Sequence, residues 1–182
     1  TGEECRRGSF FQMDHSVVFS AAYQNGLEVM DINAALARYD WLREYWWKAL
    51  TADADKYTAQ AELKPHHGYF LRALPGAKAE FPLQACLYMT QEGLAQNVHN
   101  IIIAEEGSEL HIITGCTVAP RVRSGLHIGI SEFYVRKNAR LTFTMIHNWA
   151  PDVAVRPRSA AIVEENGVFI SNYICMKPVK TL

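Results

Sequence analysis

The sequence contains no long apolar run. No stretch approaches the roughly 18 consecutive apolar residues of a membrane-spanning helix. Residues 1–26 also lack the basic start, apolar centre and small-residue cleavage site of a signal peptide. We therefore expect a cytoplasmic protein with no membrane partner.

An excess of charge of one sign is also lacking. The 182 residues carry a formal net charge of −1, so electrostatics give no reason to expect nucleic acid as a partner. The chain has four cysteines and no C-x-x-C motif: Cys5, Cys86, Cys116 and Cys175. Their wide spacing argues against a disulfide framework and against a sequence-local zinc site. We expect reduced thiols and no bound metal.

The N-terminal segment, residues 1–65, shows a helical pattern. Apolar and aromatic side chains recur every three or four residues over 31–50, and Asp31 or Asn33 is placed to cap the N-terminus. The pattern predicts a helix over about residues 33–50 that packs against the flank or the end of a core.

Residues 66–182 show a different pattern, in which β-branched and aromatic runs are separated by short polar turns. The turns are Pro75-Gly76, Glu106-Gly107, Lys137-Asn138 and Asn166-Gly167, and their last residues are 31, 31 and 29 positions apart. A repeat of about 30 residues with two strands predicts a right-handed parallel β-helix, a flattened solenoid, in a mainly β protein. We expect these repeats to continue beyond the end of this chain.

Aligning the turns predicts which residues stack on one another. The predicted columns are Ala79, Leu110, Leu141 and Ile170; Phe81, Ile112, Phe143 and Asn172; and Leu71, Ile102, Phe133 and Ile162. Apolar columns should face inward. In the turns, Glu105, Arg136 and Glu165 would place opposite charges on neighbouring coils. An antiparallel sandwich, the alternative fold, predicts no fixed period near 30.

Four strings resemble the SufB/SufD family, particularly its archaeal SufB-like members. They are Gly8-Ser-Phe-Phe-Gln-Met-Asp-His15, Gln96-Asn-Val-His-Asn-Ile-Ile-Ile103, Ala104-Glu-Glu-Gly-Ser-Glu-Leu-His-Ile-Ile-Thr-Gly-Cys116 and Thr144-Met-Ile-His-Asn-Trp149. The resemblance runs through almost the whole chain and matches the N-terminal portion of the family. It implies a core β-helix and a scaffold role in iron–sulfur cluster assembly, without enzymatic turnover.

The resemblance also implies partners. Family members work with a SufC-type ABC ATPase, bound through a C-terminal region that has no counterpart in this sequence. They also pair with a SufB/SufD-type partner or form a homodimer, and they receive sulfur from a donor. The resemblance allows a transient iron–sulfur cluster in the full-length protein but implies no stably bound cofactor. We interpret the chain as a fragment or part of a longer protein.

Cys116 is the first candidate for chemistry. Gly115-Cys116-Thr117 resembles the Gly-Cys-Thr/Ser context in which a SufB cysteine receives persulfide sulfur. Cys116 shares its strand parity with Leu110, so the thiol is expected to point into the solenoid. His147 lies one coil further on and could share a proton with the thiol and lower its pKa. The alternative is that both are ordinary core residues.

Two other functions stay open. Tyr88 and Thr90 stand where the family's sulfur path has a basic side chain and an asparagine, which leaves room for a SufD-like structural subunit without sulfur chemistry. A β-helix carbohydrate enzyme would need a pair of carboxylates on an open face. The dense carboxylates are Glu105, Glu106, Glu164 and Glu165. They alternate with basic residues in the turns, so we interpret them as solvated.

We predict that this chain neither hydrolyses ATP nor binds it tightly. It contains no G-x-x-x-x-G-K-[ST] string, and the strand–loop–helix context that cradles phosphates is also missing from the sequence. Titration of the chain with a fluorescent ATP analogue checks this. Saturable binding with a dissociation constant in the micromolar range would contradict it.

Overall fold

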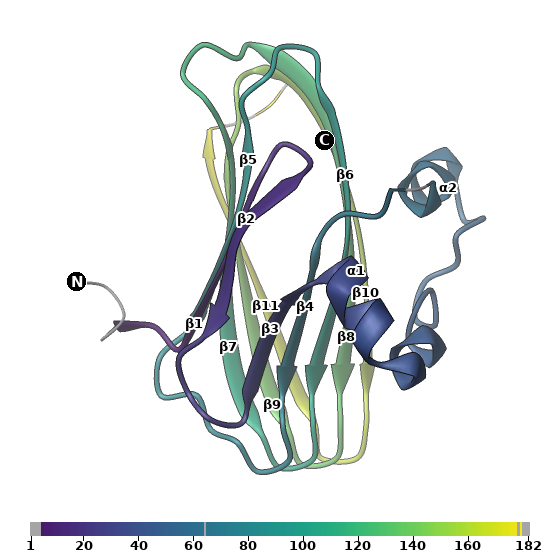
Figure 1. Ribbon diagram of the computed structural model, residues 1–182, viewed down its shortest axis with the longest axis vertical. Coiled ribbons are helices and arrows are strands. Elements are labelled where there is room, and N and C mark those ends of the chain that lie inside the picture. Colours follow the sequence, from purple (N-terminus) through teal and green to yellow (C-terminus); the bar gives the residue numbers. More distant parts are fainter. Residues whose placement is uncertain (1–4, 64, 178, 180–182) are drawn as a thin grey trace.

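The computed structural model describes residues 5–63, 65–177 and 179 and shows a flattened parallel β-solenoid of about three turns (Figure 1). One sheet contains, in spatial order, β11 (Val168–Lys177), β9 (Arg140–Asn148), β7 (Glu109–Val118), β5 (Leu83–Met89), β1 (Gly8–Met13) and β2 (Ser16–Ala22). The other contains β10 (Asp152–Val163), β8 (Ser124–Val135), β6 (Ala95–Ala104), β4 (Tyr69–Ala73) and β3 (Leu27–Asp31). We call them the first and the second sheet.

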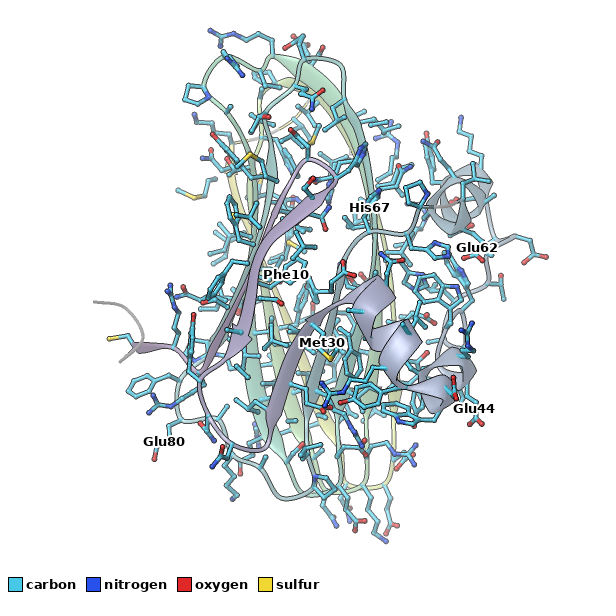
Figure 2. All side chains as sticks on the ribbon, in the orientation of Figure 1. Phe10, Met30, Glu44, Glu62, His67 and Glu80 are labelled. Carbon is cyan, nitrogen blue, oxygen red and sulfur yellow. The ribbon has the colours of Figure 1, made fainter. Side chains whose placement is uncertain are left out.

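The strand pairing confirms the predicted fold. Successive coils pair in parallel within each sheet, and Leu110 lies beside Leu141 and Ile112 beside Phe143, as the turn spacing predicts. The core fills the space between the sheets. Phe10, labelled in Figure 2, belongs to this core and packs edge-on against Tyr69, with ring centroids 5.3 Å apart.

The last turn shifts the predicted columns by one residue. The turn residues with left-handed backbone are Gly76, Gly107, Asn138 and Asn166, with φ between 56° and 71°. Asn166, and not Gly167, therefore occupies the equivalent position. Phe169 consequently pairs with Leu141, where Ile170 was predicted. Ala161 likewise pairs with Phe133, where Ile162 was predicted.

The second predicted column, that of Ile112 and Phe143, is wrong at its two ends. Leu83, not Phe81, pairs with Ile112, and Ser171, not Asn172, pairs with Phe143. The charge ladder of the turns is present with the same one-residue shift, since Arg136 pairs with Glu164 and not with Glu165.

The expected helix over 33–50 is divided in two. It consists of α1 (Ile32–Arg38) and the 3₁₀ helix η2 (Asp40–Glu44), followed by a loop, and α2 (Lys56–Glu62) comes later. The Asp31 carboxylate caps α1 as predicted. Tyr39 then takes an extended conformation, with φ −124°, and ends the helix.

Three strands of the N-terminal segment were not predicted. β1 and β2 form an antiparallel hairpin, and β3 pairs antiparallel with β4. Two β-rich runs flanking Asp14 and His15 are the pattern that could have indicated the hairpin. Asp14 takes the left-handed conformation, with φ 52°. Its carboxylate accepts hydrogen bonds from the backbone N–H and hydroxyl of Thr90, both at 2.6 Å.

The helices cover the outer face of the second sheet only (Figure 1). An aromatic cluster from this segment packs on outward side chains of β4, β6 and β8. It includes Tyr39, Trp41, Tyr45 and Trp46, which contact Phe70, Ile101, Ile103 and Tyr134. This confirms that the aromatic segment packs against the flank of a core.

The buried carboxylate of Glu132 holds this segment to the sheet. Its side chain on β8 has no exposed surface and accepts backbone N–H groups of Trp47 at 2.9 Å, Ala49 at 2.6 Å and Leu50 at 3.0 Å. His99 lies 2.9 Å away on β6. Three backbone donors that a continuous helix would use internally therefore bind Glu132, which is why the helix cannot run to residue 50.

We predict that Glu132→Gln destabilises the chain by about 2–4 kcal/mol near neutral pH, because it replaces a buried, charge-assisted acceptor by a neutral amide. Urea unfolding measures this loss. Glu164→Gln, in a partly exposed turn, is the matched control and should cost less than about 1 kcal/mol.

The pH dependence sharpens the same test. Burial raises the pKa of Glu132, but the hydrogen bonds from His99 and from the backbone outweigh burial, and the pKa lies below its ordinary value of 4.5. A carboxyl with a lowered folded-state pKa stabilises the fold above the unfolded pKa, and this stability is lost as the pH falls through the folded pKa. The chain should therefore lose this contribution below about pH 4.5, and Glu132→Gln should lack that loss. Equal acid sensitivity of the two proteins would contradict the prediction.

Candidate functional site

One column of paired residues crosses the first sheet through the candidate cysteine. In order from β1 to β11 it contains Gln12, Leu87, Cys116, His147 and Cys175. Cys116 and His147 are thus direct neighbours on β7 and β9. Their exposed fractions are 1% and 2%, so the thiol points into the solenoid as predicted.

The surroundings of Cys116 are apolar. Its Sγ lies 3.5 Å from Sδ of Met145, the inward residue two positions before His147. Burial raises the thiol pKa well above its ordinary value, and the nearby Cys86 adds to this. The expectation that His147 could lower this pKa is therefore not met in this structure, because burial raises the pKa. A neutral histidine adds no positive charge, so it cannot offset the desolvation of a thiolate.

His147 is held as a neutral base. Burial disfavours the imidazolium and lowers its pKa to about 4. Nδ1 lies 3.0 Å from the hydroxyl of Tyr173 on β11. When Nδ1 carries the ring proton and donates it to that oxygen, Nε2 has the lone pair that can take up a thiol proton.

The opposite wall of the interior adds a second imidazole. His127 on β8 is buried, with Nδ1 3.0 Å from Oε1 of Gln96, and burial together with the nearby His147 lowers its pKa to about 3. Trp149 contacts both imidazoles, with ring centroids 4.8 Å from His127 and 5.8 Å from His147. The indole N–H of Trp149 is buried without a hydrogen-bond partner. The interior here combines a thiol with neutral polar groups.

Tyr173 and His127 were not predicted as site residues. Alternate residues of a strand face the same side, and Cys175 pairs with the inward His147, so Tyr173, two residues before Cys175, also faces inward. This follows only when the last turn is aligned on Asn166 instead of Gly167. His127 comes from the second sheet, and a column argument within one sheet cannot place it. Its contact with Trp149 depends on the distance between the two sheets.

The other three cysteines differ from Cys116 in exposure. Cys175 occupies the same column, beside His147, but is exposed on the outermost strand, and its thiol donates to the carbonyl of Lys177 at 3.3 Å. Cys86 is half-buried on the outer face of the first sheet, and Cys5 is exposed. Its column shows that Cys175 belongs to the inward set of β11.

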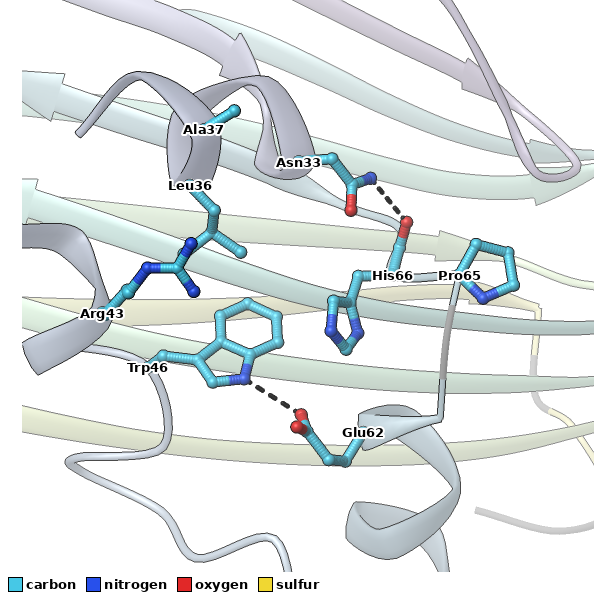
Figure 3. Close-up of a pocket in the computed structure, with 8 residues that line it drawn as sticks. All are labelled: Asn33, Leu36, Ala37, Arg43, Trp46, Glu62, Pro65 and His66. Carbon is cyan, nitrogen blue, oxygen red and sulfur yellow. Dashed lines mark hydrogen bonds between the residues drawn. The ribbon is translucent and has the colours of Figure 1, made fainter. Parts of the chain in front are cut away.

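A cavity lies away from Cys116, on the flank of the second sheet between α1, η2 and α2 (Figure 3). It measures about 750 Å³. In its wall, the indole N–H of Trp46 donates to Glu62 at 2.9 Å, and Asn33 donates to the carbonyl of His66 at 2.8 Å. These bonds join parts of the helical segment to each other and to the stretch before β4, and no cysteine lines the cavity. We therefore place the candidate site at Cys116.

Metal ligands do not gather in the described part of the chain. Within residues 5–63, 65–177 and 179, no three histidine, cysteine, aspartate or glutamate side chains are grouped so that they could hold an ion. His67, one of the adjacent histidines near the start of the solenoid, stacks on His15 with ring centroids 4.6 Å apart. Nor does any helix among the described residues have the length and apolarity needed to cross a membrane.

Comparison with known proteins identifies the family. The model of the SUF system FeS cluster assembly SufBD core domain matches residues 87–181. The chain belongs to the SufBD family. This range contains both Cys116 and His147, so the candidate site lies in the core domain that defines the family.

Named relatives extend the similarity to the N-terminal segment. A SufBD family protein of Methanothermobacter thermautotrophicus strain Winter is 50% identical over 99% of this chain and 45% of its own length. One of Archaeoglobus fulgidus is 53% identical over 96% of this chain and 47% of its own length. The SufB protein of Bacillus subtilis is 30% identical over 78% of this chain and 30% of its own length. This SufBD chain spans about half the length of the archaeal relatives.

We predict that iodoacetamide modifies Cys116 of this SufBD chain more slowly than Cys175 near neutral pH, by about two orders of magnitude. Cys116 is buried and its thiol pKa is raised, whereas Cys175 is exposed. Peptide mass spectrometry after timed quenching measures both rates in one sample. In urea the rates should converge. A folded-state rate for Cys116 equal to that of Cys175 would show that the interior is open to reagents.

Proposed function

We propose that this SufBD chain forms part of a scaffold for iron–sulfur cluster assembly and that Cys116 accepts sulfur. The observation that carries the proposal is the register of β7 and β9, which puts the cysteine of the Gly-Cys-Thr motif beside a neutral histidine inside the core domain. We also propose that the scaffold is cytoplasmic, is not itself an enzyme, and works with a SufC-type ABC ATPase. That ATPase would bind the part of the protein that this chain does not span.

The proposed step is a transfer between persulfides. His147 takes the thiol proton, and the Cys116 thiolate attacks the outer sulfur of a persulfide on the donor protein, R–S–SH. A new S–S bond forms on Cys116, and the donor's S–S bond breaks with its electron pair leaving on R–S⁻. The proton held by His147 neutralises that thiolate. The products are Cys116–S–SH and R–SH, so no external oxidant or reductant is needed.

A second function, a SufD-like subunit without sulfur chemistry, is favoured by two observations. Burial raises the pKa of the Cys116 thiol, which opposes nucleophilic attack. Thr90, which departs from the family's sulfur path, binds the Asp14 carboxylate and so holds the N-terminal hairpin. In this alternative the interior cysteine is a small core residue.

Persulfide loading separates the two functions. We predict that Cys116→Ser and Cys116→Ala reduce loading by a cysteine desulfurase with its sulfur-carrier protein to the background level, about a hundredfold, because the acceptor is lost. Cys86→Ser, on the outer face of the same sheet, is the matched control and should load normally. Loading is measured by tag-switch labelling and mass spectrometry of the intact chain.

The stability of each variant is measured alongside. Cys116→Ala leaves a small space in the core and should cost about 1–2 kcal/mol, which leaves the chain folded if its stability is typical of a domain. Full loading of a folded Cys116→Ala chain would transfer the acceptor role to another cysteine, with exposed Cys175 next in the same column. Loading of no cysteine in the wild-type chain would favour the SufD-like function.

A further inference from the structure

Within the described part of the chain, no helix covers the outer face of the first sheet, in contrast to that of the second sheet (Figure 1). Its central column, on the opposite side of the strands from Cys116, contains Phe11, Cys86, Gly115, Ile146 and Ile174 in register. These side chains are half-buried or exposed. A solvent-facing sheet surface normally carries polar residues. An apolar column that no described element covers therefore indicates a binding surface.

A groove of about 400 Å³ is set into this face above Gly115. Phe11, Phe19 and Ile113 are among its apolar walls, and the Cys86 thiol also lines it. A side-chain carbon on Gly115 would meet no atom within 4 Å, and the backbone there is not left-handed. Neither the backbone conformation nor crowding requires a glycine at position 115. Glycine in a strand also costs stability. The glycine of the Gly-Cys-Thr motif instead keeps the groove open.

Two hydrogen-bond donors at the groove lack partners. Ser9 is 8% exposed, and its hydroxyl is buried without a hydrogen bond. The Nε of Arg6 is also buried and unpaired, while its Nη1 donates to Gln84 at 3.3 Å. In the described part of the chain, no carboxylate pairs with Arg6. An unsatisfied buried hydroxyl costs stability, and a cation beside it favours an anionic acceptor.

We propose that this groove binds an acidic segment of a protein partner, with an apolar side chain against Phe11, Phe19 and Ile113 and an adjacent carboxylate on Arg6 and Ser9. The charge of Arg6 and the two free donors select the carboxylate. A small metabolite would occupy only the groove, whereas the apolar column continues past it to Ile146 and to the 46% exposed Ile174. This extent fits a protein surface. The proposal does not depend on sulfur acceptance, since the groove lies on the other face of β7.

Model peptides test the groove directly. The probe is an acetylated, amidated tetrapeptide of sequence Gly-Leu-Glu-Gly, and its control has glutamine in place of glutamate. We expect the first peptide to shift the amide resonance of Gly115 saturably and to slow alkylation of Cys86 by iodoacetamide. The glutamine peptide should bind about tenfold more weakly, because it cannot form the charge-assisted bonds to Arg6. Equal binding of the two peptides, or no shift at any concentration, overturns the proposal.

Two variants distinguish a binding groove from a structural one. Gly115→Val places a side chain in the groove, and its Cβ has no other atom within 4 Å. Binding should therefore fall at least about tenfold while the melting temperature stays the same or rises. Ser9→Ala removes an unsatisfied hydroxyl, so it should weaken binding and raise the melting temperature. Thr142→Val, on the same outer face of β9, is the matched control and should change neither.

Three results would show that the groove does not bind an acidic segment of a partner. Undiminished peptide binding by a folded Gly115→Val chain, or a lower melting temperature with unchanged binding for Ser9→Ala, overturns the proposal. Light scattering tests a second copy of the chain as the occupant. A concentration-dependent dimer that Gly115→Val abolishes would assign the groove to that copy and overturn the acidic partner.

Discussion

Successive coils of the solenoid hydrogen-bond to one another in register, and this pairing fixes which side chains reach the interior. The turns set the register, because each left-handed residue donates its N–H to the next coil. Gly76 donates to the carbonyl of Glu106, Gly107 to that of Lys137 and Asn138 to that of Glu165, all at 2.9–3.0 Å. A slip of one residue would exchange the inner and outer faces of every following strand.

The N-terminal segment depends on the same lattice of strands. β3 pairs antiparallel with β4, and the Asp14 turn of the hairpin is hydrogen-bonded to Thr90. On the second sheet, the buried carboxylate of Glu132 accepts hydrogen bonds from three backbone N–H groups in place of water, and these bonds anchor the aromatic segment. Among the described residues, no buried carboxylate of this kind lies on the outer face of the first sheet, and the groove above Gly115 is open there. The two faces of one solenoid thus have different surfaces.

The sequence was sufficient to predict the features that depend on the repeat of about 30 residues. The spacing of the turns predicted the parallel fold and the pairing of Cys116 with His147. It failed where one residue decides, because Asn166 and Gly167 both tolerate a left-handed backbone and only the three-dimensional turn selects Asn166. The helix prediction failed for a non-local reason. Glu132 lies more than eighty residues from the backbone groups that it captures, and no local pattern contains that contact.

Burial of the candidate pair has opposite effects on its two members. It raises the thiol pKa of Cys116 and lowers that of His147 to about 4, so the thiolate–imidazolium pair is disfavoured at rest. A resting pair of this kind differs from an exposed cysteine that a cation activates. If Cys116 accepts sulfur as proposed, proton transfer to His147 would need water or a charged group of the donor to restore solvation to both side chains. The low-dielectric interior would therefore couple attack on sulfur to arrival of the donor, because without the donor the thiol stays protonated.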